Sequence, residues 1–156
     1  MLGIDTLREL LAGNITVRDL IEYKQGLWEM ANISTRASGQ KFDMWLDPAG
    51  KDRNVPHNVP QLKVEFEKGN RVPVSISRNP HVYSKNVNVA GMSGIITFIS
   101  DHYVALQLHY DRKWDDAQIL RYITLVGRKK MSISDALHLM LEDGDIDFIP
   151  EEFGID

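Results

Sequence analysis

The chain has 156 residues, of which 43% are hydrophobic and 26% charged, a composition typical of a folded globular domain that excludes intrinsic disorder. It contains no cysteine, so disulfides, thiolate zinc sites and cysteine nucleophiles are excluded. The sequence has no signal-peptide pattern and no apolar run of the roughly 20 residues that span a bilayer. We therefore expect a cytoplasmic protein with no membrane partner.

The net charge of −4 hides an uneven distribution along the chain. Residues 1–35 carry three basic and five acidic side chains, residues 36–130 carry fifteen and nine, and residues 131–156 carry none and eight. A basic middle followed by an acidic end is typical of a polyanion-binding surface with an acidic tail beside it. The alternative interpretation is that these charges only keep the surface hydrated.

Two helices are predicted before the basic middle. Residues 6–12 contain a capping box and are followed by a glycine, and residues 16–32 repeat apolar side chains at helical spacing. The pair also fits a helix-turn-helix that reads DNA. The second helix, however, carries Asp19, Glu22 and Glu29 beside only two basic residues, and such a face repels phosphate. A helical hairpin packed on the core is therefore favoured.

Alternating apolar and polar residues predict an antiparallel sheet in the basic middle. Pro73 removes a backbone donor, which indicates an edge position for the strand that contains it. Glycines and a polar turn divide the stretch 86–112 into three consecutive strands. The predicted strands are residues 41–46, 61–67, 72–76, 86–89, 95–99, 104–109 and 119–126.

Ser132 or Ser134 is placed to cap a C-terminal helix that ends near Gly144. The predicted fold class is therefore α+β, in three parts that form one folding unit. These parts are a helical hairpin at 1–35, a strongly bent antiparallel β-sheet or small β-barrel at 36–130, and a C-terminal helix with an acidic tail at 131–156.

No pattern in the sequence predicts catalysis, a metal or a cofactor. Asp143, Asp145 and Asp147 have the spacing of a calcium loop, but Phe148 stands where the loop needs glycine and Gly154 where it needs glutamate. No two histidines have the i, i+4 helical spacing of a zinc site. Neither a G-x-S-x-G nucleophile elbow nor a phosphate-binding P-loop is present. We therefore expect a protein that is not an enzyme.

Residues 87–106 resemble the KOW motif of small Tudor-like barrels in ribosomal proteins and transcription elongation factors. The residues that carry the resemblance are Val87, Val89, Gly91, Gly94, Ile96, Ile99, Val104 and Leu106. The resemblance implies a strongly bent five-stranded barrel, built from residues 61–126, that binds nucleic acid or a protein through its loops. Met92 and Ser93 stand where the motif usually has basic residues.

These observations favour a non-enzymatic nucleic-acid-binding protein that contacts DNA or RNA through a basic barrel surface, with an acidic tail that competes with phosphates. The alternative is a protein-interaction module or small inhibitor that docks its acidic end on a basic protein partner. Basic residues would contact phosphate, and tyrosine or tryptophan would stack on bases. The candidate residues are Lys51, Arg53, Arg71, Arg78, Lys85, Arg112, Lys113, Arg128, Lys129 and Lys130, with Tyr103, Trp114 or Tyr83 for stacking.

Overall fold

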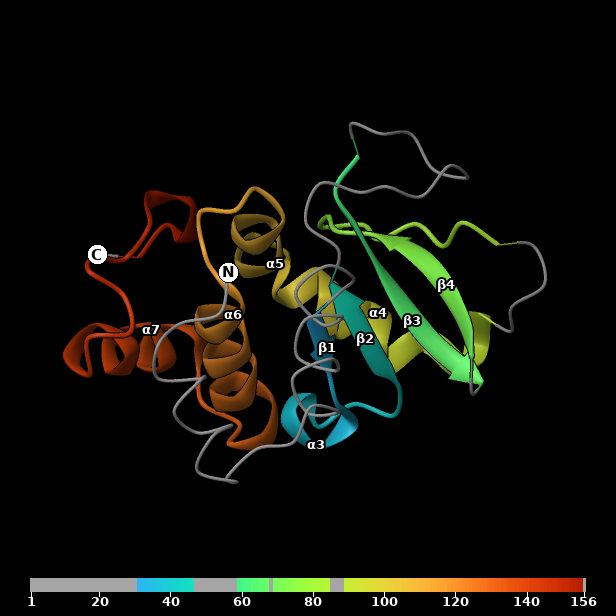
Figure 1. Ribbon diagram of the computed structural model, residues 1–156, viewed down its shortest axis with the longest axis horizontal. Helices are drawn as coiled ribbons and strands as arrows, with labels where there is room; N and C mark the ends of the chain where they lie inside the picture. The colour runs from blue at the N-terminus through green and yellow to red at the C-terminus, as the bar shows by residue number, and fades with distance from the viewer. Residues whose placement is uncertain (1–30, 47–58, 68, 85–88, 156) are drawn as a thin grey trace, which may run out of the picture. The chain divides into compact units, whose positions relative to one another are not determined.

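The computed structural model describes residues 31–46, 59–67, 69–84 and 89–155 (Figure 1). Nearly all of the predicted N-terminal helical hairpin lies outside these residues, as does nearly all of the strand predicted at 86–89; residues 31 and 32, predicted as the end of the second helix, belong to a strand instead. The chain divides into two compact units, Met1–Ala31 and Asn32–Asp156. The described residues belong to the second unit, apart from Ala31.

The described residues contain one four-stranded sheet in the order β1-β2-β3-β4, in which β2, β3 and β4 pair antiparallel. The strands are β1 Ala31–Ile33, β2 Asp43–Leu46, β3 Gln61–Glu67 and β4 Asn70–Ser75. They confirm the strands predicted at 41–46, 61–67 and 72–76. Pro73 lies on β4 at the end of the strand order, as predicted, and beyond β4 only an isolated bridge from Val74 to Val82 is formed in the described residues.

The other regular elements of the described chain are helices. They are α3 Thr35–Ser38, η1 Val89–Met92, α4 Ser93–Asp101, α5 Tyr103–Tyr110, α6 Asp116–Ile123, the π-helix η2 Thr124–Arg128, α7 Ile133–Glu142 and η3 Glu151–Phe153. The strands predicted at 95–99, 104–109 and 119–126 are therefore wrong, because α4, α5, and α6 with η2 occupy those residues. The class is α+β as predicted, but the sheet is open in the part of the chain that the structure describes.

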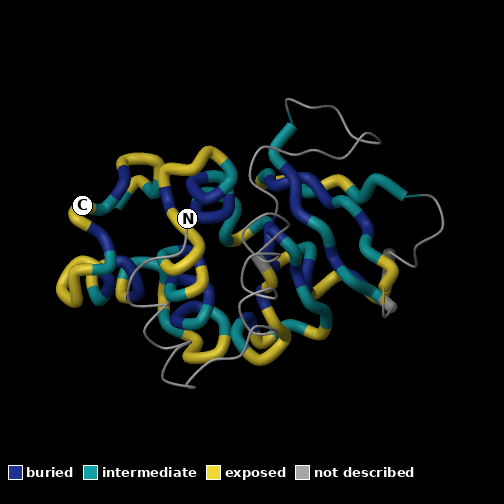
Figure 2. Tube along the Cα trace, viewed as in Figure 1, coloured by how far each residue is buried: buried dark blue, intermediate teal, exposed yellow. Residues whose placement is uncertain are grey.

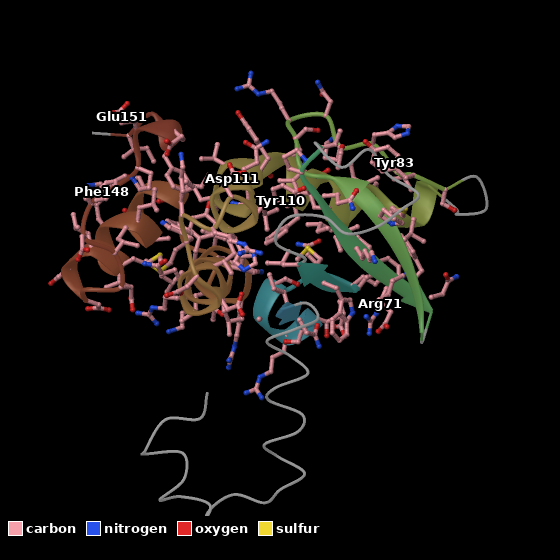
Figure 3. All side chains as sticks on the ribbon, turned by 45° about the horizontal axis from the view of Figure 1, so that its top comes forward. Arg71, Tyr83, Tyr110, Asp111, Phe148 and Glu151 are labelled. Carbon is pink, nitrogen blue, oxygen red and sulfur yellow. The ribbon has the colours of Figure 1, made fainter. Side chains whose placement is uncertain are left out.

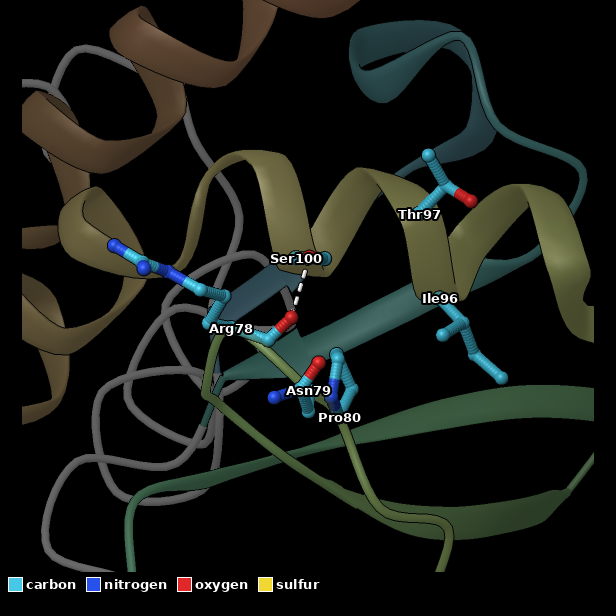
Figure 4. A pocket seen from close by; sticks show the side chains of 6 residues that line it. All are labelled: Arg78, Asn79, Pro80, Ile96, Thr97 and Ser100. Carbon is cyan, nitrogen blue, oxygen red and sulfur yellow. Dashed lines mark hydrogen bonds between the residues drawn. The ribbon is translucent and has the colours of Figure 1, made fainter.

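Burial explains why the strand prediction failed at α4. Ile95, Phe98 and Ile99 are the buried residues of this helix, which is the i, i+3, i+4 spacing of a helical face. The β-branched composition of the stretch favours a strand, but packing against the sheet overrides that preference (Figures 1 and 4).

At α5 the polar residues misled the prediction. In a strand at 104–109, the alternation places Gln107 and His109 on the solvent side, yet His109 is buried, and the side chain of Gln107 donates a hydrogen bond of 2.9 Å to the carbonyl of Ile76. Polar side chains with internal partners do not mark a solvent-facing side.

The predicted C-terminal helix is confirmed as α7, which begins after Ser132; the Ser132 hydroxyl accepts a hydrogen bond of 3.1 Å from the backbone of Asp135. The acidic segment that follows is docked and is not a loose tail. Ile146 is only 4% exposed, and the Phe153 ring lies 5.7 Å from Trp114 and 6.0 Å from Tyr122. Figure 2 shows buried residues continuing into this segment.

The backbones of α3 and η2 approach each other closely at two glycines, Gly39 and Gly127. A Cβ at Gly127 would lie 2.3 Å from the carbonyl oxygen of Ser38, a separation that atoms do not tolerate. On the other side of the contact Gly39 ends α3 with a φ of 71°, in the left-handed region that favours glycine. The two helices can therefore approach this closely because Gly127 lacks a side chain, and Gly39 provides the left-handed end of α3.

We predict that Gly127→Ala destabilises the protein by about 2 kcal/mol or more, because the new methyl group forces two backbones apart. Gly94→Ala is the matched control: its Cβ would lie 3.6 Å from the Gln40 side chain, an ordinary contact, and alanine favours the helix α4. Urea denaturation of both variants tests this. Equal stability would show that the α3–η2 contact is not tight.

Candidate nucleic-acid interface

Several of the predicted cations are already engaged by neighbouring side chains. The Arg71 guanidinium lies 3.6 Å from the centre of the Trp45 ring, and its Nε is 3.4 Å from the Glu65 carboxylate (Arg71 is labelled in Figure 3). Lys113 lies 3.8 Å from Glu152. A paired cation attracts phosphate less than a free one does. Lys51, Arg53 and Lys85 lie outside the described residues.

The predicted stacking residues are also engaged. Trp114 is only 4% exposed and packs beside Tyr122 and Phe153, so its assignment as a base-stacking residue is wrong. The hydroxyl of Tyr103 accepts a hydrogen bond of 3.3 Å from Arg78. The sequence around Trp114 is polar, which favours an exposed ring. Its burial depends on the packing of Phe153 from η3, which the sequence does not reveal.

A different set of cations is gathered where α3 meets η2. Arg128 ends η2, and Lys129 and Lys130 follow it; these three were predicted, whereas Arg36 on α3 was not. We call these four residues the basic cluster. All four are exposed, and none of them forms an ion pair with any other residue that the structure describes.

The contact between the two helices brings the cluster together. A Cβ at Gly39 would lie 3.8 Å from the backbone nitrogen of Arg128, and Arg36 is one helical turn before Gly39. The helix α3 is itself fixed to the sheet, because the backbone of Thr35 donates a hydrogen bond of 3.0 Å to the Asp43 carboxylate on β2. Arg36 was missed because its sequence neighbours give no sign of this contact.

The backbone at the end of η2 projects the last cations outward. The Lys129 amide bonds the Thr124 carbonyl at 3.0 Å, and the Met131 amide bonds the Leu125 carbonyl at 2.9 Å. Between them Lys130 has a φ of 54°. A lysine in this left-handed conformation costs about 1–2 kcal/mol relative to the right-handed one. A lysine therefore occupies a position that glycine would fit with less strain.

A purely structural role explains only part of the cluster. Cations in the last turn of a helix stabilise it through the helix dipole, and Arg36 and Arg128 are so placed. Lys129 and Lys130 follow the helix and form no pair with another described residue, so the dipole does not account for the strained lysine.

A hollow beside α4 is another candidate site on the surface that the structure describes. This hollow, of about 340 Å³, is lined by residues 78–80, 96, 97 and 100. Figure 4 shows the side chains of Arg78, Ile96 and Thr97 pointing in different directions, and Ser100 is engaged with the Arg78 carbonyl at 2.6 Å. Within the described ranges no three histidine or acidic residues are grouped as metal ligands. No helix among these residues has the length and apolarity needed to cross a membrane.

One histidine is held in an unusual environment between α4 and α6. Nδ1 of His102 is joined to the Tyr122 hydroxyl by a hydrogen bond of 2.9 Å, and the Phe98 ring lies 4.6 Å away. Burial lowers the pKa of His102 to about 4, although the nearby Asp101 charge acts in the opposite direction. Burial, together with Asp101, raises the pKa of Tyr122. Both side chains are therefore neutral at pH 7, and their hydrogen bond joins two partly buried polar groups inside the helical part of the chain.

Comparisons with known proteins found no matching family model, no matching curated protein and no matching solved structure, so they neither support nor contradict the resemblance to the KOW motif. The helical structure of residues 93–110, described above, differs from the strands which that resemblance implies.

We predict that His102 makes folding sensitive to mild acid. The folded pKa lies below the unfolded value of about 6.5, so the contribution to stability is complete above pH 6.5 and is lost as the pH falls towards 4. A shift of this size corresponds to about 3 kcal/mol.

Urea denaturation of His102→Gln, from pH 7 to pH 4, tests this prediction, because carboxylates titrate in both proteins and cancel in the comparison. The wild type should lose more stability than the variant. His138→Gln, which changes an exposed histidine on α7, is the control and should behave as the wild type. Parallel pH profiles for wild type and His102→Gln would contradict the prediction.

Proposed function

We propose that this protein is a non-enzymatic nucleic-acid-binding protein that contacts the phosphate backbone of DNA or RNA through the basic cluster. The observation that carries the proposal is the gathering of Arg36, Arg128, Lys129 and Lys130, exposed and unpaired among the described residues, at the contact between α3 and η2. Arg112, also exposed and at a φ of 61°, is a further cation that the sequence predicted.

The chemistry of the cluster matches phosphate better than carboxylate or apolar ligands. Two arginines offer planar groups that donate two hydrogen bonds at once, and two lysines offer compact charges. The four described residues of the cluster include no aromatic side chain that could stack on a base. Binding is therefore expected to depend on charge and to show little preference for sequence.

The salt dependence of binding is the first test. If all four cations contact phosphate in a duplex, the logarithm of the binding constant falls with the logarithm of salt concentration with a slope of about 3 to 4. Lys129→Gln should weaken binding and reduce this slope by about 0.9. Fluorescence anisotropy with labelled duplex DNA, single-stranded DNA and RNA measures both quantities.

Lys113→Gln is the matched control, because it removes the same charge from a lysine that already lies beside Glu152. It should change affinity less than Lys129→Gln does. Arg36→Gln, on the other helix, should resemble Lys129→Gln. Equal effects of the two lysine variants would show that only net charge matters. If the wild type binds no nucleic acid below tens of micromolar, within the usual nonspecific range, the proposed function is wrong.

The strained lysine gives a second prediction, which separates binding from stability. Lys130→Gly and Lys130→Ala both remove one positive charge, so both should weaken nucleic-acid binding equally. Glycine adopts a φ of 54° without a steric penalty, whereas alanine does not. Lys130→Gly should therefore be more stable than Lys130→Ala, by about 1 kcal/mol. Thermal melts and anisotropy titrations of the two variants measure both effects. If the less stable variant also bound nucleic acid more weakly, a direct role for the Lys130 charge would be contradicted.

A further inference from the structure

Two of the three most exposed large apolar side chains of the described chain belong to its acidic end. Phe148 is 69% exposed and Leu141 38%, and the third, Leu120 on α6, is 44% exposed. Leu141 and Phe148 flank the loop after α7, and Arg121 on α6 holds that loop, because its guanidinium lies 3.0 Å from Asp143 and 3.4 Å from Asp145. One exposed apolar residue needs no explanation, but an aromatic ring and a leucine exposed at the two ends of one anchored loop are typical of a contact surface.

The loop that carries Phe148 is held in one conformation. The amides of Asp145 and Ile146 donate to the Met140 carbonyl at 2.8 and 3.4 Å, and the Gln118 side chain donates to the Asp145 carbonyl at 2.9 Å. Ile146 and Pro150 are buried on either side of Phe148. The aromatic ring is thus presented to solvent by anchored neighbours, so little conformational entropy is lost when a partner covers it.

The charge around Phe148 is negative. Residues 131–156 contain eight acidic and no basic residues. Arg121 balances Asp143 and Asp145, and Lys113 lies beside Glu152. The exposed carboxylates of Glu142 and Asp147, next to Leu141 and Phe148, have no cationic partner among the described residues.

We propose that Leu141, Glu142, Asp147 and Phe148 form an acidic docking surface for a basic amphipathic peptide segment of a partner protein. Apolar side chains of the segment cover Phe148 and Leu141, and its lysines or arginines face Glu142 and Asp147. The same negative charge repels nucleic acid and anionic lipid. This surface goes beyond the proposed nucleic-acid binding and does not depend on it, since it shares no residue with the basic cluster.

The test uses the full chain and two fluorescent synthetic peptides of lysine and leucine. One peptide has helical amphipathic spacing and the other is a scramble of the same composition. The wild type should bind the amphipathic peptide about tenfold more tightly than the scramble, a difference that two covered apolar side chains readily supply. Phe148→Ala should remove most of this difference, and it should leave thermal stability unchanged because the ring is exposed.

Matched acidic variants identify the charges that matter. Asp147→Asn should weaken peptide binding, whereas Asp111→Asn, which neutralises an exposed carboxylate at the end of α5, should not; Figure 3 labels Asp111 and Phe148 in separate places. Lys129→Gln should leave peptide binding unchanged. The two proposals can therefore fail independently, because different variants test them.

Three results would overturn this inference. Equal affinity for the two peptides would mean attraction by net charge alone. Equal effects of Asp147→Asn and Asp111→Asn would place the contact elsewhere. Self-association of the wild type in sedimentation, abolished by Phe148→Ala, would show that a second copy of this chain covers the surface in place of a partner peptide.

Discussion

The close approach of α3 and η2 is the constraint on which the rest of this structure depends. Gly127 leaves no room for a side chain, since its Cβ would lie 2.3 Å from the Ser38 carbonyl oxygen. Because α3 is hydrogen-bonded to β2 through Asp43, this contact links the sheet to the π-helix that follows α6. A tight backbone contact is rigid, so the elements that it joins hold a fixed relative position.

The same contact sets the chemistry of the surface. It places Arg36 beside the end of the π-helix, where the left-handed Lys130 terminates a run of three cations. Short π-helices are often found at functional sites. On the acidic side, the ion pairs of Arg121 and the docking of Phe153 turn a segment that composition describes as a tail into part of the core. The cations of the basic cluster and the carboxylates of Glu142 and Asp147 therefore lie on different elements, and neither set forms an ion pair within the described residues.

The sequence predicted the elements whose burial follows a simple period. The strand at 61–67 alternates cleanly, and α7 has a serine cap and a helical apolar face. The prediction was wrong for α4 and α5. The β-branched residues of α4 favour a strand by composition, and the polar residues of α5 that bond internally give the alternation of a half-buried strand. Arg128, Lys129 and Lys130 were named as candidates from their charge alone. The position of Arg36 beside η2 and the burial of Trp114 could not be predicted, because both depend on contacts between elements far apart in sequence. From the sequence, Phe148 served only to argue against a calcium loop. Its exposure to solvent could not be predicted, because it depends on how the loop after α7 folds.

The most direct measurement is an NMR titration of the isotope-labelled chain with a short single-stranded oligonucleotide at low salt, following backbone amide signals. The account predicts that the signals of Arg36 and of residues 127–131 move together, with one common affinity, while those of residues 142–152 do not move. Changes confined to residues 142–152, or to β4 around Arg71, would contradict the claim that the contact of α3 with η2 builds the phosphate-binding surface.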